Sequence, residues 1–209
     1  MNKGHSGVCA DQGHSYRSLE QIAHKVRGYL NLTNDEALNG LELFENLDEI
    51  SIKLRNGKVI PFRSGVVALE DSEGYTRYDM RKNFMEILAS EQTYDRLEAG
   101  HSRATYFIAH ELGHCVLHTD QLVRLAELPV RQQAAFHRGR KGHEPYEDTE
   151  WQANAFASAM LMPAIGLQIL DEKHGCLTVS LVAERFGVSI EAAGYRLDLF
   201  ENRRSELLT

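Results

Sequence analysis

"TYFIAHELGHCVLHTD", residues 105–120, is a mostly apolar stretch that nevertheless carries three histidines and one glutamate. On a helical wheel, with about 100° per residue, an apolar stripe lies on one side and the histidines stack on another. The stripe consists of Ile108, Leu112, Cys115 and Val116, and the histidines are His110, His114 and His118. Because its polar groups are segregated, this helix is predicted to bury one face in the core and to present the other to a site.

Within this stretch, "HELGH" is a His-Glu-x-x-His motif formed by His110, Glu111 and His114. Two histidines at positions i and i+4 project in parallel and can both bind one tetrahedral zinc ion. Glu111 is rotated by one position, too far round to be a ligand, but it is placed to take a proton from a water at the metal. His118 continues the stack and is expected to support the site, because a catalytic zinc keeps one position open. The spacing therefore predicts metal-assisted hydrolysis of an amide.

A catalytic zinc site needs a third protein ligand, which we expect in "EDTEWQANAFASAMLMP", residues 147–163. On a helix through this stretch Glu150 shares a face with Asn154 and with the small residues Ala153 and Ala157, which let a second helix pack closely. Asn154, one turn after Glu150, can hydrogen-bond a metal-bound imidazole through its other nitrogen. Glu150 is therefore the predicted third ligand, and Asn154 is predicted to hydrogen-bond one of the metal-bound histidines.

Two alternatives to Glu150 stay open. Glu147 lies on much the same face of the predicted helix. Asp120 lies six residues past His114, a spacing that one group of zinc peptidases uses after a glycine turn, but Leu117 occupies the glycine position here.

The two segments "YDRLEAGHSRATYFIAHELGHCVLH" and "EWQANAFASAMLMP", which lie within residues 94–163, resemble the ImmA/IrrE family of zinc metallopeptidases. Members typically read "R-x-x-F-x-x-A-HELGH-x-x-LH" and later "E-x-x-AN-x-FA-x-x-LLMP". They often have Glu directly before the Ala-Asn pair, where this chain has Gln152. The resemblance implies a zincin-like α+β core and cleavage of a helix-turn-helix repressor in stress response or mobile-element control.

The rest of the chain predicts a small, mostly antiparallel sheet followed by helices. Alternating apolar residues on both sides of Asn56-Gly57 predict a hairpin, and "GVVALE", "YTRYDM" and "FMEILAS" are further strand candidates. Helical spacing predicts helices in the segments 16–32, 91–100, 105–118, 120–128 and 148–162, with one more opened by Pro163 and two short helices at the end. The fold class is thus α+β, with the "HELGH" helix packed on the helix that bears Glu150.

We expect a flexible tail over residues 1–14, a metallopeptidase core over residues 15–175 and a helix-turn-helix-like region over residues 176–209. The last region reads as a helical hairpin in "SLVAERFGVSIEAAGYRL". A role in reading DNA is disfavoured, because its second helix offers Arg196 alone against two acidic residues.

Composition excludes several classes of protein. The net charge of -7 argues against general affinity for nucleic acid or anionic membrane. Three scattered cysteines and the lack of an apolar leader favour the cytoplasm. Residues 151–170 hold no charge and are long enough to cross a membrane, but their polar residues and Pro163 favour two buried helices instead. No pattern indicates an oligomeric state.

The basic loop over residues 131–143 is predicted to be solvated, although its cluster Arg138, Arg140 and Lys141 could guide an acidic partner. Stabilising the oxyanion needs a donor besides zinc, and none is assigned among His137, His143 and Tyr146.

Together these features predict a cytoplasmic zinc endopeptidase with one zinc ion per chain. His110, His114 and Glu150 are the expected ligands and Glu111 the general base. The substrate is expected to be a regulatory protein met in trans. A non-catalytic metal-dependent binding protein and a DNA-binding regulator with a structural metal are the alternatives.

Overall fold

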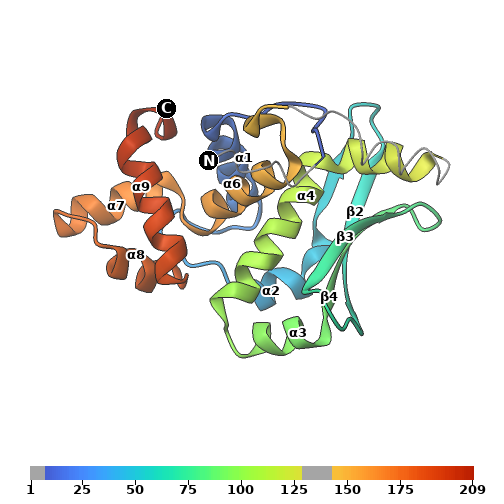
Figure 1. Cartoon of the computed structure of the whole chain (residues 1–209), viewed down its shortest axis with the longest axis horizontal. Coiled ribbons are helices and arrows are strands. Elements are labelled where there is room, and N and C mark those ends of the chain that lie inside the picture. The colour runs from blue at the N-terminus through green and yellow to red at the C-terminus, as the bar shows by residue number, and fades with distance from the viewer. Residues whose placement is uncertain (1–7, 129–142) are drawn as a thin grey trace.

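The computed structural model of the chain describes residues 8–128 and 143–209. Figure 1 shows a sheet on one side of α4 (Ser102–Glu127) and a group of helices on its other side. The strands are β1 (Ser51–Lys53), β2 (Val59–Val67), β3 (Gly74–Asp79) and β4 (Phe84–Ser90). The other helices are α1 (Tyr16–Tyr29), α2 (Gly40–Glu45), η1 (Leu47–Glu49), α3 (Glu91–Glu98), η2 (Pro145–Glu147), α6 (Thr149–Leu161), α7 (Ala164–His174), α8 (Val179–Phe186) and α9 (Ile190–Leu207). The predicted α+β class is confirmed.

The sheet has the strand order β1-β2-β4-β3. The β1–β2 and β3–β4 pairs are antiparallel and the β2–β4 pair is parallel, so the described sheet is mixed but mostly antiparallel, as predicted. The predicted turn at Asn56-Gly57 joins β1 to β2, and Gly57 adopts a φ of 86° that favours glycine. The sequence predicted two separate strands for the return of the hairpin and for "GVVALE". In the structure, the return of the hairpin and the start of "GVVALE" form the single strand β2.

α4 is the helix on which the site is built. It runs unbroken from Ser102 to Glu127, whereas the sequence pattern suggested two helices in this stretch. No glycine or proline lies between His114 and Glu127, so nothing in the sequence interrupts the helix there. α4 packs against β3 and β4 on one side and against α6 on the other.

The apolar stretch that resembles a membrane span folds as α6 and α7, separated at Met162-Pro163. Thr149–His174 is long and apolar enough to cross a membrane, but 67% of its most apolar segment is buried inside the fold. Proline cannot continue the preceding helix, so the chain turns here. These are core helices, as predicted.

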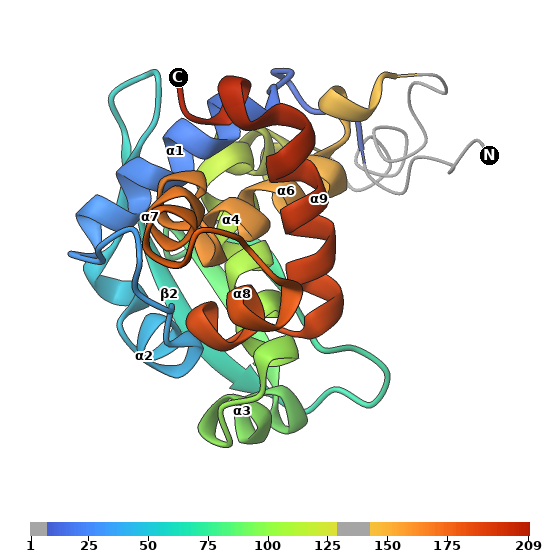
Figure 2. The same cartoon turned by 90° about the vertical axis from the view of Figure 1, so that its left-hand side faces the viewer.

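The C-terminal residues form the predicted hairpin of α8 and α9, joined at Gly187, whose φ is 64°. Figure 2 shows α7, α8 and α9 together on the side of the molecule that faces the viewer. α9 is longer than expected, at 18 residues, and has non-helical backbone at Arg203. Arg196 on α9 is buried and pairs with Glu20 on α1 at 2.7 Å, which ties the hairpin to the rest of the fold.

Residues 8–14 lie against η2 and the start of α6. The backbones of Val8, Ala10 and His14 are hydrogen-bonded to residues 146–149, and Cys9 forms a β-bridge with Asp148. These contacts tie residues 8–14 to the fold, although the composition suggested a tail, and residues 1–7 lie outside the described residues. The division into domains stays a prediction.

Candidate metal centre

The centre lies where α4 crosses α6, and Gly113 of the "HELGH" motif allows the helices to approach. A Cβ added at Gly113 would lie 3.1 Å from Phe156 Cδ1 and 3.2 Å from Ala153 Cα. Ala153 and Ala157 are both fully buried against α4. The small residues predicted to flank Glu150 therefore stand at a close helix crossing, which brings side chains of the two helices together.

Three side chains meet at this crossing. The Nε2 atoms of His110 and His114 lie 3.1 Å apart. Each lies 3.3 Å from an oxygen of the Glu150 carboxylate. Over residues 8–128 and 143–209, these three form the one group of at least three His, Cys, Asp or Glu side chains whose ligand atoms all lie within 4.8 Å of one another.

The hydrogen bond of His110 on its far side determines which ring nitrogen carries the proton. His110 Nδ1 lies 3.1 Å from Asn154 Oδ1, the contact that the spacing of Glu150 and Asn154 predicted. The Tyr106 hydroxyl donates to the same oxygen at 3.1 Å, so this atom is an acceptor and His110 Nδ1 donates to it. In the neutral imidazole the proton is then on Nδ1, and Nε2 faces the centre with a bare lone pair.

His114 and His118 are joined by their Nδ1 atoms, which lie 3.1 Å apart. The other nitrogen of His118, Nε2, lies 2.9 Å from Gln152 Oε1. Burial, with the neighbouring charge of His114, lowers the pKa of His118 to about 3, so the ring is neutral near pH 7. His118 thus lies behind His114 and takes no part in the cluster that faces the centre.

The electrostatics of the centre favour a positive charge among the three groups. The neighbouring imidazoles of His110 and His114, which donate to the carboxylate when they are protonated, hold the pKa of Glu150 well below its usual range. Burial lowers the pKa of His110, but the hydrogen bond that its protonated ring makes to Glu150 and the charges of Glu111 and Glu150 outweigh burial, and the pKa is raised. The lowered pKa of Glu150 and the raised pKa of His110 both mean that the ionised carboxylate favours a positive charge beside it.

This donor set fits zinc. Two ligands about 2.1 Å from a zinc ion at tetrahedral angles are about 3.4 Å apart, close to the 3.1–3.3 Å observed. Two imidazole nitrogens and a carboxylate oxygen are among the ligand atoms that zinc prefers. The site would leave a fourth position for water or substrate.

Comparison with known proteins gives a family for this part of the chain. Residues 99–198 match the family model of the IrrE N-terminal-like domain, a peptidase family designated M78. The matched stretch contains the "HELGH" motif, Glu150 and Asn154. Residues 99–198 therefore contain an IrrE N-terminal-like domain. The resemblance predicted from the sequence is thereby confirmed, and a peptidase with a metal site is the activity that this family supports.

Two further comparisons add little. No curated protein matches the chain. Among solved structures, a Mycobacterium tuberculosis transcriptional regulator matches with a TM-score of 0.49 and 18% sequence identity, over 86% of this chain. The chain spans only 55% of the length of that structure.

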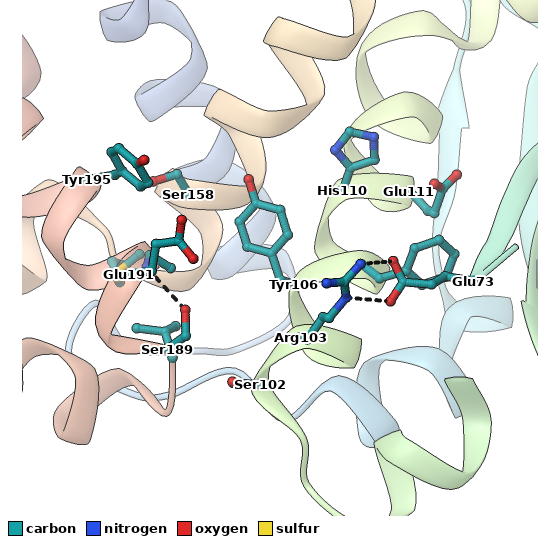
Figure 3. A pocket seen from close by; sticks show the side chains of 14 residues that line it. Glu73, Ser102, Arg103, Tyr106, His110, Glu111, Ser158, Ser189, Glu191 and Tyr195 are labelled. Carbon is teal, nitrogen blue, oxygen red and sulfur yellow. Dashed lines mark hydrogen bonds and ion pairs between the residues drawn. The ribbon is translucent and has the colours of Figure 1, made fainter. Parts of the chain in front are cut away.

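In this IrrE-like domain, Glu111 lies between two cavities that share its side chain and His110. The larger, of about 670 Å³, lies between α4 and the start of α9; the smaller, of about 270 Å³, includes His114, Glu150 and part of β3. Figure 3 shows the larger cavity with Tyr106, His110 and Glu111 on one side and Ser189, Glu191 and Tyr195 facing them. Glu111 is 8% exposed, so its carboxylate is within reach of both cavities but largely shielded from solvent.

The two alternative ligand candidates lie outside this cluster. Asp120 and Glu147 are not part of the cluster. The carboxylate of Glu147 accepts a hydrogen bond from the backbone N–H of Glu144 at 3.1 Å. Because α4 continues without a turn, Asp120 stays on the helix instead of turning back toward His114.

The candidate oxyanion donors do not meet at the centre either. His143 contacts Asp148 at 3.0 Å, and Tyr146 is exposed. His137 and the basic residues Arg138, Arg140 and Lys141 lie outside the described residues.

Sequence reasoning missed two residues of the IrrE-like site. Tyr106 lies one helical turn before His110, so the i−4 spacing was a signal that could have identified it. Burial raises the pKa of its hydroxyl. Gln152 was noticed only as a departure from the family pattern, and its contact with His118 depends on how two helices cross.

Proposed function

We propose that the chain is a zinc-dependent endopeptidase that cleaves a regulatory protein. In this proposal His110, His114 and Glu150 hold one zinc ion, and Glu111 is the general base. Asn154 and His118 orient the two histidines. The observation that carries the proposal is the convergence of three ligand atoms within 4.8 Å, beside a carboxylate that opens to two cavities.

A zinc ion at this position would polarise a peptide carbonyl and make a water nucleophilic near pH 7. Glu111 would take the proton of that water and pass it to the leaving amine. Its low exposure excludes bulk water from the carboxylate, which strengthens its interaction with charge that develops in the transition state. Asn154 and His118 would hold the imidazole rings in one orientation, so that their Nε2 lone pairs stay directed at the centre.

The larger cavity is the proposed place for the peptide on one side of the scissile bond. The lining includes the apolar residues Phe107, Met162, Val188 and Ala192. Arg103, which also lines the cavity, forms an ion pair with Glu73 at 2.8 Å. Tyr195 lies on the opposite side of the cavity (Figure 3). Its ring is 70% exposed and offers an aromatic surface to an extended chain.

A helix-turn-helix repressor, encountered in the cytoplasm during stress response or mobile-element control, is the substrate class that the resemblance to the ImmA/IrrE family suggests. Direct binding to nucleic acid is not part of the proposal. Arg196 is buried and paired with Glu20, so it is not available to a phosphate.

The test is Glu111→Gln, compared with wild type in cells, with new protein N-termini mapped by labelling and mass spectrometry. Removing a general base should lower cleavage by about 10²–10⁴-fold, while zinc content stays at the wild-type level. We expect new N-termini within a regulatory protein with wild type and none with Glu111→Gln. A biological effect that persists unchanged in Glu111→Gln would instead identify a metal-dependent binding protein, and loss of zinc from this variant would contradict the assigned role of Glu111.

A further inference from the structure

Gln152 has an amide whose orientation is determined by its surroundings. One end of the amide lies 2.8 Å from the backbone oxygen of Gln12 and 2.7 Å from that of Tyr146. Two carbonyl oxygens can be satisfied only by the NH₂ group, so this end is Nε2. The other end, Oε1, then faces His118 Nε2 at 2.9 Å. Gln152 is fully buried, so water does not compete for these contacts.

This orientation determines the proton position on His118. Because Oε1 only accepts, His118 Nε2 must carry the proton and donate it. In a neutral imidazole the other nitrogen, Nδ1, is then bare. That bare nitrogen lies 3.1 Å from His114 Nδ1, which must donate to it. Once Nδ1 of His114 carries the proton, Nε2 of His114 is bare and points at Glu150 and His110.

We propose that Gln152 is a positioning residue for the metal centre, acting through His118 to fix the tautomer of His114. The inference rests on the proposed function, since a bare Nε2 is what a metal ligand requires. A carboxylate has no proton to donate to the carbonyl oxygens of Gln12 and Tyr146, whereas the amide satisfies both of them and His118 together.

Zinc affinity, measured by competition with a chelator, tests the relay in two substitutions. Gln152→Met, of similar volume, removes both the acceptor for His118 and the donor to the two carbonyl groups. Gln152→Glu keeps the acceptor and loses only the donor. We expect Gln152→Met to bind zinc about 10–100-fold more weakly than wild type, and Gln152→Glu to stay within about threefold of wild type.

A matched control separates the relay from a structural effect. Gln121 is also a buried glutamine, and it also holds the N-terminal segment, through Cys9 O and Asp11 N at 3.1 Å each. Because the hydrogen bonds of its amide go to the backbone of Cys9 and Asp11, Gln121→Met should leave zinc affinity unchanged. Equal losses in Gln152→Met and Gln152→Glu would overturn the proposal, because they would mean that Gln152 only ties down the N-terminal segment.

A double-mutant cycle tests whether the effect passes through His118. His118→Phe removes the acceptor for His114, so Gln152→Met should cause no further loss of zinc affinity in that background. Additive losses would contradict the relay.

Imidazole ¹⁵N spectra of the metal-free protein give a readout that does not depend on zinc. They should show His114 protonated at Nδ1 in wild type and a mixture of tautomers in Gln152→Met. If wild type shows this tautomer but binds no zinc, the proposed function fails and the relay stands. If wild type binds zinc with the same affinity as Gln152→Met, the relay fails and the proposed function stands.

Discussion

Two regions of this molecule bring polar side chains together, one fully buried and one partly exposed, and they do so in opposite ways. At the junction of α1, α6 and α9, Arg196 donates to Glu20 and to the Met162 carbonyl, and Glu20 accepts from the N–H of Ala164. At the crossing of α4 and α6, two imidazole nitrogens and a carboxylate oxygen face one another, all of them acceptors once the hydrogen bonds behind them are assigned.

The difference separates structure from function. Donors opposite acceptors satisfy each other, so the arginine junction needs nothing further and serves to hold helices together. Acceptors that face other acceptors repel one another unless a cation lies among them. The cluster of His110, His114 and Glu150 is therefore stabilised by binding a cation. Clustered polar groups thus indicate a site when their unshared electron pairs converge.

The largest expected effect on folding comes from breaking the arginine junction with Arg196→Met. This leaves the buried carboxylate of Glu20 without its cation and should destabilise the protein by about 3–5 kcal/mol in urea unfolding. Zinc per folded chain should not change. The double variant with Glu20→Met should be less destabilised than Arg196→Met, and loss of zinc from folded Arg196→Met would mean that the two regions are not independent.

A smaller effect is expected where the two helices of the centre touch. Gly113→Val places side-chain atoms against Phe156 and Ala153, which should lower the free energy of unfolding by about 1–3 kcal/mol. It should also weaken zinc binding, because pushing α6 away from α4 displaces Glu150. Gly28 on α1 has nothing within 4 Å of an added Cβ, so Gly28→Val is the matched control. Calorimetry would measure the stability of both variants, and zinc competition would measure their zinc affinity. Equal stability and equal zinc affinity in the two variants would refute close packing as the reason for glycine at position 113.

The smallest effect is expected behind His110. Asn154→Ala removes the acceptor for Nδ1 and should weaken zinc binding by about tenfold, with little change in stability because the side chain is exposed. Asn154→Asp keeps an acceptor and should bind zinc nearly as well as wild type. An Asn154→Ala protein with unchanged zinc affinity would show that this hydrogen bond does not orient the ring.

The comparison also explains what could be predicted from sequence. Spacing within one helix was sufficient to predict that His110 and His114 project together and that Asn154 lies one turn from Glu150, and the structure has the Asn154–His110 hydrogen bond expected from this. The hairpin at Asn56-Gly57 was predictable for the same reason, since its signal is local.

Contacts between distant segments were not predictable in this way. The contact of His118 with Gln152 joins two helices, and the amide of Gln152 is turned by a backbone carbonyl from the N-terminal segment. The parallel pairing of β2 with β4 likewise depends on tertiary arrangement. The length of α4 was underestimated because amphipathic spacing changes along it, although no residue interrupts the helix.

Metal content shows whether the converging acceptors of α4 and α6 form a zinc site. Purified wild type, His114→Ala, Glu150→Ala and Arg196→Met should be compared by mass spectrometry after each is shown to be folded. We expect about one zinc ion per chain in wild type and in Arg196→Met, and none in His114→Ala or Glu150→Ala. Zinc retained by Glu150→Ala, or absent from wild type after zinc is added, would contradict this expectation.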